Sequence, residues 1–161
     1  MESIMQKTID KKVSASLASF IYKTATMGGE SITDIMPKAK EGDRPGELEK
    51  LRSELSRQFS EYENIAAEAE QYLSTLNIEA KEENMLTKIS AKAGIMMNTM
   101  KDASPSHISE MMIQGLAMGI TEMTSKVRES KEQACDDKMI ALGDRLVSFQ
   151  EDAVDRMKKF L

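Results

Sequence analysis

The sequence has few of the residues from which nucleophilic and metal sites are built. It contains one cysteine, Cys135, and one histidine, His107, among 161 residues. One cysteine cannot form an intramolecular disulfide, and one cysteine with one histidine cannot supply the four ligands of a tetrahedral zinc site. Two aspartates follow Cys135, and their negative charge disfavours its thiolate form. We therefore expect no disulfide framework, no zinc site of Cys and His, and no cysteine nucleophile.

Long apolar runs and an excess of positive charge are also missing. No stretch approaches the ~20 consecutive apolar residues of a membrane-spanning helix, and the first residues, MESIMQKTIDKK, lack the apolar core of a signal peptide. The formal net charge is −5, and acidic and basic residues are interleaved, which gives no broad cationic surface for phosphates. We expect a soluble cytoplasmic protein that neither spans a membrane nor binds nucleic acid.

Aromatic residues make up only 4% of the chain, whereas methionine occurs 14 times. A core with so few rings has to be built from Leu, Ile, Ala and Met, a composition that favours long helices. A chain of 161 residues is long enough to bury a continuous core. The composition therefore predicts a single all-α domain over residues 1–161.

Apolar residues recur at steps of three and four along five segments. Helices are predicted over about residues 4–27, 46–76, 79–101, 105–130 and 136–160, with the longest loop at about 37–46. The clearest stripes are Leu55, Phe59, Tyr62, Ala66, Ala69, Leu73 and Leu76 in the second segment and Met139, Leu142, Leu146, Phe149, Ala153, Met157 and Phe160 in the last. The short connections between the later helices predict an antiparallel up-and-down bundle of four to five long helices.

Three short signals set the expected helix ends. Gly28 and Gly29 are expected to interrupt the first helix. Asn77 is a plausible end for the second. Ser104 with Pro105 is a start signal, because the hydroxyl can cap free amides and proline tolerates the first helical position.

Small and flexible residues gather on one face of the fourth predicted helix. Two glycines inside a helix cost about 1 kcal/mol each relative to alanine, so Gly115 and Gly119 indicate that something approaches the backbone closely. That neighbour is either a crossing helix, a bound apolar ligand or a side chain of a partner. The predicted binding or close-packing face consists of Met111, Met112, Gly115, Met118 and Gly119. Core filling is the simplest role of its methionines, and of Met96, Met97 and Met100, while copper(I) binding and a groove for a partner helix are alternatives.

Glu122 is the first candidate for a buried carboxylate. It follows Gly115, Met118 and Gly119 on a largely apolar face, and an inward charge there needs a partner. A basic residue of another helix, or a place at the rim of the apolar stripe, explains Glu122 without function. With Glu63 or Glu68 it could instead hold one metal ion. His107 is expected at the surface or in a helix cap, because it falls in the first turn of its helix.

The long helices, the extended loop after the first helix and the string EMMIQGLAMGI at residues 110–120 resemble small uncharacterised bacterial helical-bundle proteins, some of ferritin-like architecture. The resemblance covers the second to fifth helices and implies a bundle. Ferritin-like proteins often bind iron or manganese through paired Glu-x-x-His motifs, which this sequence lacks. No metal ligand is therefore carried over to any residue.

The leading hypothesis for function is contact with other proteins without catalysis, by self-association or with a different partner, through the face of the fourth helix. No cofactor is predicted. One rival is a ferritin-like bundle with a degenerate or unusual carboxylate metal site at Glu122, Glu63 or Glu68. The other is a small-molecule carrier with an apolar pocket between the third and fourth predicted helices, where Gly115 and Gly119 omit side chains.

Overall fold

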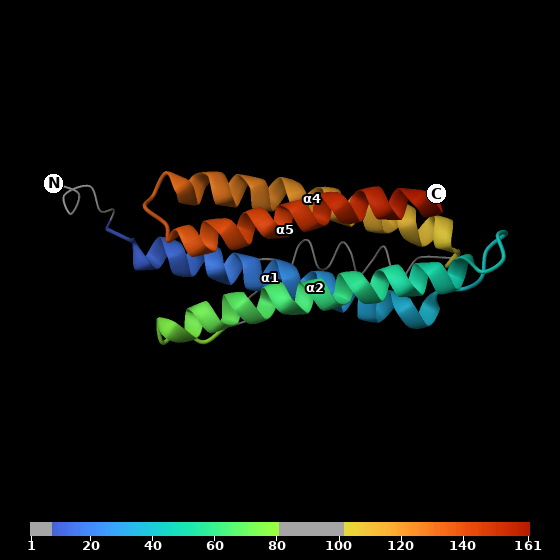
Figure 1. The fold of residues 1–161 in the computed structure, drawn as a ribbon, viewed down its shortest axis with the longest axis horizontal. Helices are drawn as coiled ribbons and strands as arrows, with labels where there is room; N and C mark the ends of the chain where they lie inside the picture. The colour runs from blue at the N-terminus through green and yellow to red at the C-terminus, as the bar shows by residue number, and fades with distance from the viewer. Residues whose placement is uncertain (1–7, 81–101) are drawn as a thin grey trace.

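The computed structural model describes residues 8–80 and 102–161, and all the regular structure in these two ranges is helical (Figure 1). Four long helices, α1 (Lys11–Ile35), α2 (Glu47–Thr75), α4 (Pro105–Lys131) and α5 (Asp137–Met157), pack against one another. Short 3-10 turns, η2 (Met36–Lys38) and η4 (Lys158–Phe160), follow α1 and α5. The predicted all-α bundle is confirmed for this part of the chain, while the predicted helix at 79–101 falls almost wholly outside it.

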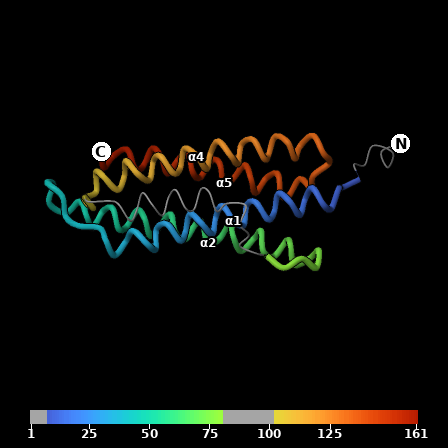
Figure 2. Tube along the Cα trace, turned by 180° about the vertical axis from the view of Figure 1, so that it is seen from behind, coloured from blue at the N-terminus to red at the C-terminus, as the bar shows by residue number. Residues whose placement is uncertain are grey.

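The helices form two antiparallel hairpins. α1 and α5 run in one direction along the bundle, and α2 and α4 run in the other (Figures 1 and 2). α1 packs most extensively on α2, and α4 packs most extensively on α5. Contacts of α1 with α4 and α5, and of α2 with α5, join the two hairpins into one bundle.

The structure corrects both ends of the first predicted helix. Residues 8–10 are not helical, and α1 begins at Lys11 because the Asp10 side chain accepts hydrogen bonds from the amides of Lys12 and Val13, at 2.9 and 3.2 Å. The helix also continues through Gly28 and Gly29 to Ile35 instead of stopping there. Gly28 packs directly against the ring of Tyr62, where a side chain would overlap it. These glycines therefore permit a close crossing with α2.

The other predicted helix signals have mixed outcomes. Asn77, just beyond α2, has a φ of 58°, in the left-handed region that often ends helices. Pro105 begins α4, but the Ser104 hydroxyl makes no hydrogen bond to the amides of that helix. Every member of the apolar stripe predicted for the last segment is buried. The stripe of α2 is buried or half-buried throughout.

Hydrogen bonds close the two ends of the bundle. At one end the amide of Lys40 donates to the carbonyl of Ala103 at 2.9 Å, and the Arg44 guanidinium donates to the carbonyl of Phe160 at 3.1 Å. At the opposite end the amide of Asp136 donates to the Ser14 hydroxyl at 2.8 Å, and the Tyr72 hydroxyl donates to the Asp136 carboxylate at 2.9 Å. Among the described residues, no helix is apolar over a length that would cross a membrane.

Candidate functional site

The face predicted on α4 does not form one continuous surface. Met112 is buried in the core, whereas Met111 and Met118 are half-buried. Gly119 lies against the amide of Gln150, which would be 2.5 Å from an added Cβ. Gly115 is exposed, and no described atom comes within 4 Å of the place where its Cβ would be. Gln150 of α5 therefore fills the space beside Gly119, which agrees with close helix packing there. The apolar pocket predicted between the third and fourth helices falls partly outside the described residues and stays a prediction.

The three candidate metal carboxylates do not converge. Glu122, Glu63 and Glu68 are all exposed, so the inward orientation considered for Glu122 is wrong. Glu68 instead accepts a hydrogen bond from Arg145 of α5. The described residues contain no group of three or more His, Cys, Asp or Glu side chains that could hold a metal ion. They give the carboxylate metal site no geometric support, and it stays a prediction.

His107 and Cys135 occupy ordinary structural positions. The His107 side chain is 56% exposed, and its Nδ1 lies 2.8 Å from the Asp102 carboxylate. Cys135 is buried, and this burial raises the pKa of its thiol; the charges of Asp136 and Asp137 raise the pKa further. The sequence predicted the effect of the aspartates, while the larger effect of burial depends on the fold.

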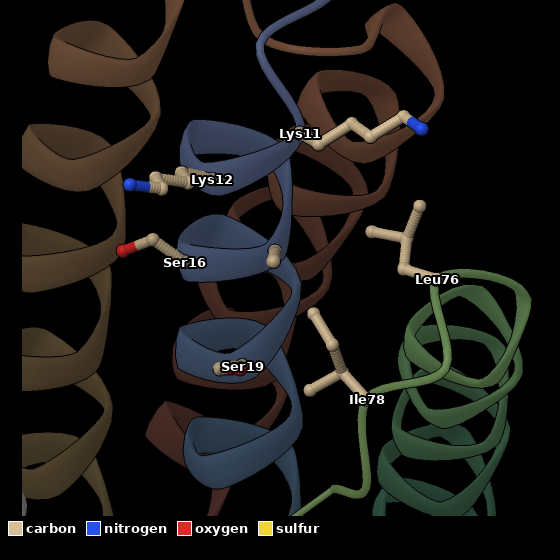
Figure 3. A pocket seen from close by; sticks show the side chains of 7 residues that line it. Lys11, Lys12, Ser16, Ser19, Leu76 and Ile78 are labelled. Atoms are coloured by element: carbon tan, nitrogen blue, oxygen red, sulfur yellow. The ribbon is translucent and has the colours of Figure 1, made fainter.

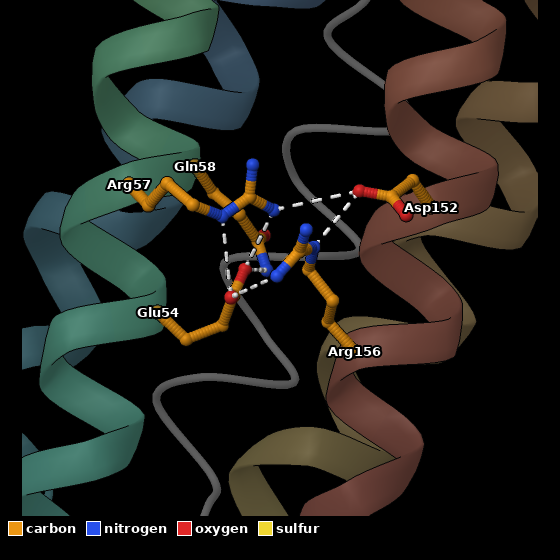
Figure 4. Close-up of polar contacts among 5 residues, drawn as sticks. All are labelled: Glu54, Arg57, Gln58, Asp152 and Arg156. Atoms are coloured by element: carbon orange, nitrogen blue, oxygen red, sulfur yellow. Dashed lines mark hydrogen bonds and ion pairs between the residues drawn. The ribbon is translucent and has the colours of Figure 1, made fainter.

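A polar cluster joins α2 to α5, and sequence reasoning missed it. The Glu54 carboxylate accepts hydrogen bonds from Arg57 and from the Gln58 amide, each at 2.9 Å (Figure 4). On the α5 side, Arg156 donates a hydrogen bond to Asp152 of the same helix at 2.9 Å. The Arg156 guanidinium also lies 3.6 Å from the Glu54 carboxylate of α2. Since acidic and basic groups neutralise one another here, the cluster is a structural connection between two helices.

A small groove near the start of α1 combines apolar and basic residues. It has a volume of about 340 Å³ and lies beside Leu76 and Ile78, which follow the end of α2. Figure 3 shows the side chains of Lys11 and Lys12 pointing to opposite sides of α1. The ammonium groups of Lys11 and Lys12 therefore do not converge on this groove.

A second groove, of about 430 Å³, runs along the seam between α1 and α2. We call it the contact groove. Half-buried Tyr22 of α1 and half-buried Phe59 and Ala66 of α2 provide apolar lining, and the Phe59 ring packs over Gly29. Exposed Ala67 borders it from α2. Among the described residues, aromatic rings and small side chains of both helices thus line a groove that is open to solvent.

The charged residues that line the contact groove are all acidic. They are Glu30 of α1 and Glu63 and Glu70 of α2, each of them exposed. Residues two positions apart on a helix are separated by about 200°, so Glu63 and Glu70 face away from the side on which Glu61 and Glu68 contact Arg145. Glu63 and Glu70 therefore lie on the flank of α2 that points away from the Arg145 ion pairs.

No protein-family model, curated protein or solved structure matches this chain.

Proposed function

We propose that this chain is a non-catalytic helical bundle that acts by contact with another protein through the contact groove. The observation that carries the proposal is a groove with apolar lining that the described residues leave open between α1 and α2, two helices that bury their other faces in the core. A helix laid into such a groove covers this apolar lining. Protein contact was also the function predicted from the sequence. The contact surface differs, because the contact groove lies at the seam of α1 and α2 and not on α4.

The residues of the groove favour a helical partner. Tyr22, Gly29 and Thr33 lie along one side of α1, and Phe59, Ala66 and Glu70 lie along α2. Steps of three, four and seven place side chains of one helix in successive turns on the same face. The walls therefore repeat with the period of a helix, which suits ridge-into-groove packing of a third helix.

Affinity capture with the full chain as bait tests this proposal. Ala67→Arg fills the groove with a long side chain, and Ala141→Arg places the same side chain on an exposed position of α5. We expect an identified protein to be retained by the wild-type chain and by Ala141→Arg and to be lost from Ala67→Arg. Identical capture by all three chains would contradict a contact through the groove.

Self-association is the simplest form of the proposed contact. If the partner is a second copy, the molar mass from light scattering rises with concentration for the wild type and for Ala141→Arg, while Ala67→Arg stays monomeric. A wild-type molar mass of 18.0 kDa at every concentration would assign the contact to a different protein.

A further inference from the structure

We draw no further inference here: the strongest candidate, the side-chain cluster of Ser14, Tyr72 and Asp136 beside the buried thiol of Cys135 at one end of the bundle, carries nothing, because its polar groups already pair with one another and with nearby backbone and nothing in the described part of the chain points to a ligand there.

Discussion

Two glycines in the middle of long helices show how differently the same residue type is used in this protein. At Gly28 a side chain would overlap the Tyr62 ring, which is buried and packs edge-on against Phe149, with the ring centroids 4.8 Å apart. At Gly115 the corresponding space is open among the described residues. The identity of the residue is the same, but the packing around it decides whether alanine is tolerated.

Alanine substitutions are expected to have opposite effects at these two positions. Gly28→Ala should lower the free energy of unfolding by about 1–3 kcal/mol, because the added Cβ would overlap the buried Tyr62 ring, which has to shift. Gly115→Ala should raise it by up to about 1 kcal/mol, since alanine loses less conformational entropy in a helix. Urea titration of both variants measures the difference, and equal destabilisation would contradict the close crossing at Gly28.

Tyr62 predicts how stability changes at high pH. Burial raises its pKa from 10.0 to about 12, although the nearby Gln150 side chain lowers it in part. Above pH 10 the unfolded chain releases this proton while the folded chain keeps it, so stability falls with rising pH, by up to about 2.7 kcal/mol between pH 10 and 12. Urea titrations from pH 9 to 11 should show a smaller loss for Tyr62→Phe than for the wild type. The same loss in both would mean that other groups cause it.

At the scale of whole helices, α2 and α5 are joined by long polar side chains. Arg145 of α5 donates to Glu61 at 2.9 Å and also to Glu68, and Arg156 reaches Glu54. The Glu54 side chain is only 12% exposed, and it is the acceptor for the fully buried amide of Gln58. Glu54 is therefore the one member of these clusters whose removal leaves a buried donor without its acceptor.

Truncation of Glu54 should be costly. Glu54→Ala is expected to lower the free energy of unfolding by about 2 kcal/mol, because the buried Gln58 amide loses its hydrogen bond. The matched change Glu151→Ala, at an exposed position of α5, should stay within about 0.5 kcal/mol of the wild type. Thermal or urea unfolding of the two variants provides the comparison. A Glu54→Ala chain as stable as Glu151→Ala would show that the buried Gln58 amide does not depend on Glu54.

The sequence predicts single helices far better than contacts between them. The stripe of α5 follows from periodicity alone, because each member is related to its neighbours by helical geometry. The end predicted for α1 was wrong because Gly28 packs against Tyr62, a residue of another helix. The contact groove was missed for the same reason: Glu63 and Glu70 show their spacing in the sequence, but only the packing of α1 on α2 places them beside Tyr22 and Gly29.

At the scale of the whole molecule, the two flanks of α2 have different surroundings. Glu61 and Glu68, on the flank that faces α5, pair with Arg145, whereas Glu63 and Glu70, on the opposite flank, border the contact groove. Leu55, Tyr62 and Ala69 of the same helix are buried in the core. A partner in the contact groove therefore adds a layer on the outer side of α1 and α2.

Site-specific photo-crosslinking tests whether a protein partner occupies the contact groove. A photoreactive residue is placed at position 67 in the groove or, as the control, at position 141 on α5, both exposed positions, and the chain is irradiated in the cells that produce it. We expect position 67 to give a covalent adduct with one identifiable protein or with a second copy of the chain. We expect no adduct from position 141. Adducts of equal yield from both positions, or no adduct from position 67, would contradict a partner in the contact groove.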